Sequence, residues 1–571
     1  MSHGSRRALI VKALALPAAV GAGVLGWQFP GDGPRPRPAA EASAGPAGAE
    51  EVGTTGYAVP RDAVVVSPQG DDGADGTLAR PLRTVAKAVA AAGDKGTVVL
   101  RGGVYHETVT IPAGKRLTVQ AYPREAVWFD GSSPVRRWAA RDGAWESDGW
   151  TARFDASPTY TAGARPSADP EFQFVSPQHP MASHPDQLWV DGAAQRQVGS
   201  RAEVKGGAFY VDEQAGRLVM GSDPRGHDVR ASTLGEAVTV RGAGSVLRGF
   251  GVRRYATALP QLGTVKIAAA GVGVENVAVT ESATTGLSVL AGGARLTKVT
   301  ASRNGLLGVH GNYADDLRLS AVRADGNNTE HFKYAPVSGG VKITRSRKVT
   351  IEHSVAADNF GKGFWLDESV RDIALVADKA VRNADHGFVL ELSARAVVAG
   401  NVARGNDGAG MKVNDTSDVQ IWNNTVAGNE RGLWIVQDRR VKGAPGTPGG
   451  DPRYKGADPE MTWRAEKVTV GNNVFGAGRP GARCALCVED ATGGGAAGMG
   501  LVIDGNAYSG GRGTPILWAG RGGTPTGYPG PERFREGTGQ ERSGRPRPLP
   551  APIAALVKRP PGTLHQGAWI S

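Results

Sequence analysis

A short motif that begins with glycine returns at a nearly constant interval through the second half of the chain. The starts GVKIT, GFWLD, GFVLE, GMKVN and GLWIV, from Gly340 to Gly432, are spaced by 23, 24, 23 and 22 residues. An earlier copy, GVHGN, begins at Gly308. A regular period of this length indicates stacked units that contact only their neighbours. The 83 glycines against only 13 phenylalanines and 11 tyrosines also favour turns and short strands over one thick core.

An asparagine precedes most of these glycines by four residues, and the last of them by three. The positions are Asn304, Asn359, Asn383, Asn406 and Asn429. Asparagine tolerates left-handed backbone and can hydrogen-bond its own turn. A stacked asparagine in each unit therefore predicts a tight turn that is repeated at the same corner.

Within each five-residue unit the second and fourth positions are mostly apolar. They are Val341 and Ile343, Phe364 and Leu366, Phe388 and Leu390, Met411 and Val413, and Leu433 and Ile435. Because side chains alternate across a strand, these positions face inward and the third and fifth face outward. A second apolar run such as KVTIEHSV follows in each repeat, so each coil holds at least two strands. We predict an all-β, right-handed parallel β-helix of the pectate-lyase type, with neighbouring rungs about 4.8 Å apart.

The regions outside the regular repeats predict the domain organisation. Residues 59–124 are expected to form the N-terminal cap and first coils, with a capping helix over residues 82–92 that covers the open end. The period fails over 125–235, which is rich in hairpin-like strands and predicts a small inserted β-rich domain. Coils resume over 236–521, and 522–571 is a Pro/Gly-rich tail expected to wrap the solenoid irregularly or to be partly disordered.

The first residues are typical of an export segment. Arg6 and Arg7 precede an apolar run interrupted by Lys12, and the opening resembles a twin-arginine signal, with an ordinary secretory signal as the alternative. We therefore predict that 1–27 is an export signal or anchor and that the protein is secreted or extracellular. It would contact a membrane only if this segment is retained. The Pro/Ala/Gly-rich stretch 28–58 is predicted to be a flexible linker.

Charge and cysteine content restrict the partners. The formal net charge of +11 is compatible with an acidic glycan, nucleic acid or a cell envelope. Much of the excess lies in the C-terminal tail, so we predict no nucleic-acid partner. Cys484 and Cys487 have no second ligand pair beside them, which argues against zinc and predicts no metal site of this kind. A local disulfide and two buried thiols both remain open.

The outward fifth positions place two acidic residues on successive units. These positions are Asn312, Thr344, Asp367, Glu391, Asn414 and Val436. Like charges on paired strands cost a few tenths to about 1 kcal/mol, so stacking Asp367 over Glu391 calls for a functional reason. A separation of about 5–5.5 Å is that of retaining glycosidases, and proximity splits the two pKa values. We predict that Asp367 and Glu391 are catalytic.

Side chains around the acidic pair are candidates for substrate binding. Trp365 and Trp434 stand at outward third positions, where they can offer flat faces to sugar rings, and Asn414 follows the pair at the fifth position. Lys342 and Lys412 flank the pair at third positions. The alternative for these lysines is a surface ladder that merely neutralises the carboxylates. The expected partner is a polysaccharide or oligosaccharide.

An insertion between Gly308 and Gly340 stretches that interval to 32 residues. It contains NNTEHFKYAPVSG and so carries Glu330, His331 and Lys333 toward the same edge of the sheet. A loop with ionisable and aromatic residues is how a rigid scaffold commonly builds a cleft. We therefore predict that Glu330 and His331 line the substrate site.

Two stretches resemble known families. VSPQGDDGADGTLARPLRTVAKAV resembles the N-terminal signature of secreted β-helix carbohydrate enzymes, including polysaccharide lyase family 9 and the β-xylosidases of glycoside hydrolase family 120. GFWLDES, followed one coil later by HGFVLELS, is similar to the family-120 pattern. The resemblance implies that Asp367 is the nucleophile and Glu391 the acid/base. It also implies a β-domain inserted among the coils, in agreement with 125–235.

Two other functions remain open. A polysaccharide lyase would use Lys342 or Lys412 as the base, and calcium is a possible cofactor that would neutralise the substrate carboxylate. Its candidate ligands are Asp367, Glu368, Glu391 and Asp415. A non-catalytic glycan-binding or cell-envelope protein is the third function, because β-helices also serve as stiff rods.

Overall fold

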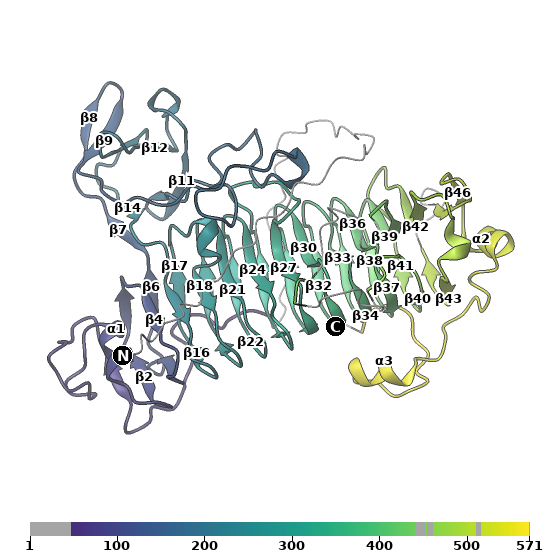
Figure 1. The fold of residues 1–571 in the computed structure, drawn as a ribbon, viewed down its shortest axis with the longest axis horizontal. Helices are drawn as coiled ribbons and strands as arrows, with labels where there is room; N and C mark the ends of the chain where they lie inside the picture. The colour runs from purple at the N-terminus through teal and green to yellow at the C-terminus, as the bar shows by residue number, and fades with distance from the viewer. Residues whose placement is uncertain (1–46, 441–450, 454–460, 510–514, 570–571) are drawn as a thin grey trace, which may run out of the picture.

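The structure is a computed structural model that describes residues 47–440, 451–453, 461–509 and 515–569. Within these residues three long sheets of stacked strands wind around one core, and Figure 1 shows their rungs following one another along the long axis. The register is parallel and in step from rung to rung, as in Val341 beside Phe364 on the next coil. The predicted parallel β-helix is confirmed.

One sheet, which we call the carboxylate sheet because Asp367 and Glu391 end two of its strands, is parallel apart from its last strand. In the described residues its strands, in spatial order, are β4 (Val109–Ile111), β15 (Val238–Val240), β18 (Val265–Ile267), β21 (Thr285–Val289), β24 (Leu307–Asn312), β27 (Gly339–Thr344), β30 (Lys362–Asp367), β33 (Phe388–Glu391), β36 (Ala409–Asn414), β39 (Arg431–Gln437), β42 (Cys484–Asp490), β45 (Ile516–Ala519) and β46 (Pro525–Tyr528). It carries the five-residue units of the repeat.

Two further parallel sheets complete each coil. The first holds β1 (Val64–Val66), β2 (Thr97–Leu100), β5 (Thr118–Ala121), β16 (Val246–Arg248), β19 (Gly273–Glu275), β22 (Arg295–Thr297), β25 (Arg318–Ser320), β28 (Arg347–Glu352), β31 (Arg371–Val376), β34 (Ala394–Ala399), β37 (Ser417–Trp422), β40 (Val468–Gly471) and β43 (Val502–Asp504). The second holds β3 (Gly103–Tyr105), β6 (Val127–Asp130), β17 (Gly251–Arg253), β20 (Ala278–Thr280), β23 (Thr300–Ser302), β26 (Arg323–Asp325), β29 (Val355–Ala357), β32 (Lys379–Val381), β35 (Val402–Arg404), β38 (Thr425–Ala427), β41 (Val474–Phe475) and β44 (Ala507–Tyr508). Each regular coil therefore has three short strands rather than the minimum of two.

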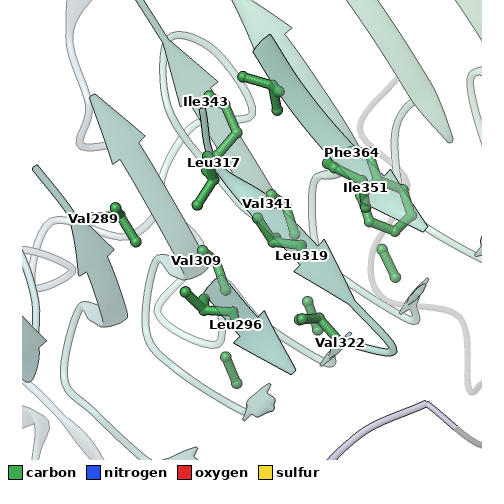
Figure 2. Packing of buried hydrophobic residues seen from close by; sticks show 14 of the residues in the cluster. Val289, Leu296, Val309, Leu317, Leu319, Val322, Val341, Ile343, Ile351 and Phe364 are labelled. Atoms are coloured by element: carbon green, nitrogen blue, oxygen red, sulfur yellow. The ribbon is translucent and has the colours of Figure 1, made fainter. Parts of the chain in front are cut away.

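The inward side chains form one continuous apolar core. Figure 2 shows residues from successive coils, such as Val309, Val341 and Phe364, pointing into the same interior. Phe364 and Phe388 stack with ring centroids 5.2 Å apart and planes 13° apart. Burying a side chain of this size contributes about 1.5–3 kcal/mol, so the alternation seen in the sequence accounts for the solenoid.

The predicted asparagine stack is confirmed, but the asparagines are not the residues with left-handed backbone at this corner. Asn359 Nδ2 donates to Asn383 Oδ1 at 2.8 Å, and the ladder runs through Asn304, Asn327, Asn359, Asn383, Asn406 and Asn429. The left-handed residue is not the asparagine but the one before it, for example Asp358 with φ of 55°. The asparagines serve by satisfying buried carbonyl and amide groups along the corner.

The predicted inserted β-rich unit is present as a mostly antiparallel sheet. Its strands among the described residues, in spatial order, are β7 (Ser132–Pro134), β14 (Val229–Ser232), β10 (Leu188–Val190), β11 (Ala193–Gln197), β12 (Ala208–Asp212), β13 (Arg217–Met220), β9 (Ala144–Asp148) and β8 (Ala139–Arg141). It has its own small core, including Phe209 and Met220. Figure 1 shows it projecting from the N-terminal part of the solenoid. The exact domain boundaries proposed from the sequence stay predictions.

Both ends of the solenoid are covered. The capping helix α1 (Val85–Ala91) begins later than predicted because Thr84 caps it, accepting from Lys87 N at 3.3 Å. Its Val85 side chain joins the main core. At the other end α2 (Pro531–Thr538) places Phe534 against the same core, and α3 (Ala551–Leu556) packs on the side of the coils. The tail is therefore more ordered than its composition predicts.

Part of the predicted linker lies on the solenoid. Residues 47–58 cross several coils, with Gly48 N donating to Ala321 O at 2.7 Å and Asn276 Nδ2 donating to Tyr57 Oη at 2.7 Å. Hydrogen bonds, and not an apolar core, hold this segment in place. Because composition indicates only the lack of a core, it suggested a free linker. The remainder of the predicted linker and the whole export segment, 1–27, lie outside the described residues.

The predictions of export and of possible membrane contact rest on that N-terminal segment. Among the described residues no helix combines the length and the apolar character that crossing a bilayer requires. Secretion through 1–27 stays a prediction.

Candidate active site

The two predicted carboxylates end neighbouring strands of the carboxylate sheet. Leu366 of β30 pairs with Leu390 of β33, so Asp367 and Glu391 follow on adjacent rungs. Both leucines are buried in the core, and both carboxylates therefore leave from the opposite, outer face. One strand spacing separates the two backbones, about 4.8 Å.

Asp367 is covered rather than open to solvent, with only 6% of its surface exposed. Its Oδ2 accepts from Lys342 Nζ at 2.9 Å, and its Oδ1 accepts from Glu368 N at 2.7 Å. Burial raises the pKa of Asp367 to about 6, the charge of Glu391 acts in the same direction, and Lys342 opposes both. Asp367 thus leaves the outer face of the sheet without being open to solvent, because Lys342, which Pro336 O of the inserted loop binds, lies against it.

Glu391 is held by two donors that sequence reasoning did not assign to it. Its Oε1 accepts from Arg440 Nη2 at 2.7 Å and its Oε2 from Trp365 Nε1 at 3.0 Å. Burial acts to raise the pKa of Glu391, but the positive charges of Arg440 and Lys412 outweigh it and lower the pKa to about 2. Glu391 is thus the ionised member of the pair and Asp367 the one that more readily holds a proton.

Trp365 is not an open platform for a sugar ring. Only 4% of it is exposed, and the ammonium groups of Lys342 and Lys362 lie 3.3 and 4.1 Å from its ring centroid. Lys362 Nζ also pairs with Asp385 Oδ2 at 2.9 Å. The expectation that Trp365 stacks on substrate fails because these cations occupy its surroundings; its N–H holds Glu391 instead.

Trp434 has a similar set of neighbours but remains half-buried. Lys412 Nζ lies 4.7 Å and Arg431 Cζ 4.3 Å from its ring centroid, and the ring of His386 lies 5.9 Å away, edge to face. Within the described part of the chain, Trp434 Nε1 is buried and donates to no acceptor.

Arg440 forms ion pairs with three carboxylates, one of which is that of Glu391. Its Nη2 lies 3.2 Å from Asp415 Oδ2 and 2.7 Å from Asp438 Oδ2, besides Glu391. Asn414, on the rung after Glu391, donates from Nδ2 to Asp438 Oδ2 at 3.2 Å. Burial and the neighbouring Asp438 raise the pKa of Asp415 to about 8. Asn414 therefore supports this carboxylate cluster rather than projecting freely.

The inserted loop reaches the site with different groups from those predicted. Its carbonyl oxygens act, since Pro336 O accepts from Lys342 Nζ at 2.5 Å and Tyr334 O accepts from Lys362 Nζ at 3.0 Å. His331 instead stacks on His179, with centroids 4.6 Å apart.

Glu330 lies half-buried over the turn at Gly305, and burial raises its pKa to about 7. Within the described residues no hydrogen bond or ion pair joins Glu330 or His331 to Asp367 or Glu391. The structure thus keeps both loop residues near the covered face without bringing either into contact with the acidic pair.

A segment of the inserted unit covers the same face. Tyr160 stacks on His310, the outward residue one rung before Lys342, with centroids 5.5 Å apart and planes 11° apart. Lys333 N donates to Phe174 O at 2.8 Å, which ties this segment to the loop. The sequence carried no signal for this cover because the insertion has no repeat.

Several neighbours of the pair had a signal that was overlooked. Lys362 and His386 stand directly before the repeat glycines Gly363 and Gly387, with Asp385 before His386. Extending the repeat unit backward by these residues would have placed them beside the outward columns. Arg440 had no such signal, because it lies after the last strand of its coil.

Comparisons with known proteins agree with this architecture. Residues 265–442 match the family model described as right handed beta helix region. XylC, solved in complex with xylose, superposes with a TM-score of 0.59 at 15% identity over 78% of this chain and 83% of XylC. The chain is a right-handed parallel β-helix protein. Its predicted handedness is thereby confirmed.

Two other matches are weaker or shorter. The mannuronan C-5 epimerase AlgE4 A-module of Azotobacter vinelandii gives a TM-score of 0.41 at 14% identity, covering 73% of this β-helix protein and 87% of the module. The uncharacterized protein YwoF of Bacillus subtilis (strain 168) is 40% identical over 76 residues, which are 13% of this chain and 16% of YwoF.

The structure also shows the state of the two cysteines and whether acidic side chains cluster. Cys484 and Cys487 form a disulfide, one of the two alternatives left open by the sequence. The described residues contain no group of three or more His, Cys, Asp or Glu side chains arranged to hold a metal ion. Asp72, in the acidic loop 71–75 that precedes α1, accepts from Thr84 N at 2.8 Å and so holds the residue that caps this helix.

Proposed function

We propose that the protein is a retaining glycoside hydrolase that uses Asp367 and Glu391 as its two carboxylates. The observation that carries the proposal is their placement on adjacent rungs with opposite pKa shifts, Asp367 raised to about 6 and Glu391 lowered to about 2. Retaining enzymes need one carboxylate ionised and the other protonated at about 5–5.5 Å.

The charges assign the two roles. Glu391, kept ionised by Arg440 and Trp365, attacks the anomeric carbon while the bond to the leaving oxygen breaks and Asp367 transfers its proton to that oxygen. Asp367 then takes a proton from water, which displaces Glu391 from the sugar and restores the starting state. This is the reverse of the roles that the family resemblance implies, in which Asp367 is the nucleophile.

The positioning contacts and one structural neighbour support a saccharide substrate. Lys342 orients Asp367 at 2.9 Å, and Arg440 orients Glu391 at 2.7 Å. XylC, which shares the fold, was solved with xylose.

Product analysis tests the proposal. Wild-type protein is incubated with plant and bacterial glycans, reducing ends are quantified, and the first-formed anomer is identified by NMR. We expect new reducing ends with retained configuration and their near-complete loss in Asp367→Asn. The charge-matched control Asp316→Asn, whose side chain is 61% exposed, retains activity. Inverted product, or full activity in Asp367→Asn, would contradict the proposal.

A lyase is the second candidate, favoured by one observation. Burial lowers the pKa of Lys412, and within the described residues its ammonium has no ion-pair partner, whereas Lys342 is paired with Asp367. A lysine that deprotonates easily can act as the base that removes the proton next to a uronate carboxylate. Ultraviolet absorbance from a conjugated uronate product would identify this reaction, and hydrolysis gives none. Absence of both products would leave a glycan-binding protein.

A further inference from the structure

The outer face around Trp434 gathers hydrogen-bond donors that lack acceptors. Trp434 Nε1 and Arg431 Nε are both buried without a hydrogen-bond partner in the part of the chain that the structure describes. The Arg431 guanidinium lies 4.3 Å from the Trp434 ring, so the two donors belong to one cluster. Buried donors without acceptors are costly in a folded protein and are commonly explained by an absent partner.

Lys412 adds a positive charge to the same cluster. Its Nζ lies 4.7 Å from the Trp434 ring and makes no hydrogen bond or ion pair with any described residue. The other two lysines of this face, Lys342 and Lys362, each pair with a carboxylate at 2.9 Å. Burial lowers the pKa of Lys412, and the charges of Glu391 and Asp385 oppose this only in part.

His386 contributes a third kind of donor. Its Nδ1 accepts from Ala409 N at 2.9 Å, and burial lowers its pKa to about 3, so the ring is neutral and its proton is on Nε2. Among the described residues Nε2–H makes no hydrogen bond, and Asp385 Oδ1 lies 3.3 Å from Nδ1. The ring stands 5.9 Å from that of Trp434.

The acidic side chains nearby are already engaged. Glu391 is bound by Arg440, Asp385 by Lys362, and Glu430 by Arg431. Glu489, which also acts on Arg431, forms an ion pair with Arg483 at 3.1 Å. A cluster of donors that includes one ammonium without an ion pair among the described residues suits an anionic oxygen group, since hydrogen bonds from charged donors to such groups are the strong ones.

The cluster lies within one sugar unit of the acidic pair. Lys412 is on β36, the strand next to β33 that ends in Glu391, and Trp434 is opposite Lys412 on β39. One to two rungs correspond to about 5–10 Å. A saccharide placed with one ring at Glu391 therefore presents its neighbouring ring to Lys412 and Trp434.

We propose that Lys412, His386, Arg431 and Trp434 form a subsite for an acidic sugar, and that they bind a carboxylate or sulfate group on the unit next to the cleaved bond. The position of this unit next to a cleaved bond rests on the proposed function, but recognition of the anionic group does not. Carboxylate and sulfate both present anionic oxygen atoms on a saccharide, and the experiment distinguishes between these two groups.

Matched ligand pairs test the subsite. Binding to full-length Asp367→Asn protein is measured by calorimetry with uronic-acid oligosaccharides and their carboxyl-reduced forms, and with sulfated oligosaccharides and their desulfated forms. We expect the anionic member of at least one pair to bind about ten-fold or more tightly, with the difference shrinking as salt is added. A preference in only one type of pair identifies the source as carboxylate or sulfate. Equal affinities within every pair would overturn the proposal.

Substitutions locate the effect. Lys412→Met should reduce the affinity ratio of anionic to neutral ligand to about one, and Lys412→Arg should retain most of it, because charge is restored. The control Lys87→Met, on the exposed face of α1, should keep the ratio. A preference that survives Lys412→Met would show that the anion binds elsewhere.

The outcomes separate this proposal from the proposed function. Anionic preference without any bond cleavage by the wild type supports the subsite and contradicts the hydrolase. Cleavage of neutral glycans with equal affinities within all pairs supports the hydrolase and contradicts the subsite. Unsaturated product together with complete inactivity of both Lys412 variants toward every glycan would make Lys412 a lyase base rather than a binding residue.

Discussion

Trp365 and Trp434 occupy the same outward position on the carboxylate sheet, three rungs apart, yet their surroundings are opposite in character. Each has two cationic side chains beside its ring. At Trp365 the indole N–H donates to Glu391, and both lysines pair with carboxylates. At Trp434 the N–H and Lys412 have no such partner among the described residues.

The difference teaches how a repeat acquires function. Backbone geometry is nearly the same on every rung, so equal positions present equal side-chain directions. What distinguishes them is whether loops and neighbouring rungs supply the matching groups. The polar groups around Trp365 satisfy one another, whereas Trp434 Nε1 has no acceptor among the described residues, and for this reason we propose a ligand there.

The largest expected effect comes from removing the negative charge of Glu391, which lies beside Trp365. Glu391→Gln keeps the shape but removes the charge that Arg440 and Trp365 stabilise. We expect kcat for glycan hydrolysis to fall about 10³-fold or more. Initial rates measured beside the exposed control Glu213→Gln check this. Activity within ten-fold of wild type would remove Glu391 from the mechanism.

Replacing one lysine beside each tryptophan compares how much the two regions contribute to the free energy of unfolding. Lys342→Met leaves the buried Asp367 without its partner and should lower the free energy of unfolding by about 3–5 kcal/mol at pH 8. Lys412→Met removes a charge that has no ion-pair partner among the described residues, and it should cost less because only the longer-range attraction to Glu391 is lost. Urea denaturation of both variants measures the difference. Equal losses would mean that the contrast between the two regions has no energetic basis.

The pH dependence of activity sharpens the assignment of the acid. Burial raises the pKa of Asp367 from 3.8 to about 6, so the native state binds this proton more tightly than the unfolded chain. Its stabilising contribution is present below the ordinary pKa and is lost as pH rises through about 6. Activity that needs the proton should fall about ten-fold per pH unit above this value.

Lys342→Met supplies the control for that profile. Because Lys342 lowers the pKa of Asp367, its removal should move the alkaline limb to higher pH. Glu391 behaves oppositely: its pKa is lowered from 4.5 to about 2, so its contribution is present above the ordinary value and is lost as pH falls. An alkaline limb that does not move in Lys342→Met would assign it to another group.

The smallest expected difference is between the two tryptophans themselves. Trp365→Phe loses a hydrogen bond to the charged Glu391 and should cost about 1.5–3 kcal/mol more than Trp434→Phe, whose N–H has no partner in the described residues. Urea denaturation of both variants without ligand gives this comparison. A larger cost at Trp434 would show that its N–H is already satisfied in the free protein.

Much of the fold and part of the site could be predicted from the repeat. The alternation around Phe364 and Phe388 placed both in the core, and the same alternation placed Asp367 and Glu391 on adjacent outer positions. The roles of Glu330 and His331 could not be predicted, because a loop without a period has no register to copy. His331 packs against His179, which is distant in sequence.

By itself the sequence determined the solenoid, its core, its asparagine ladder and the neighbouring positions of the two carboxylates. Those features follow from local alternation and a constant period, which each coil repeats. Only the tertiary structure decided which carboxylate is ionised, since Arg440 reaches Glu391 from 49 residues away and Lys342, which pairs with Asp367, is bound by the Pro336 carbonyl of the inserted loop. Electrostatic environment depends on what packs nearby in space, and no periodic pattern encodes that.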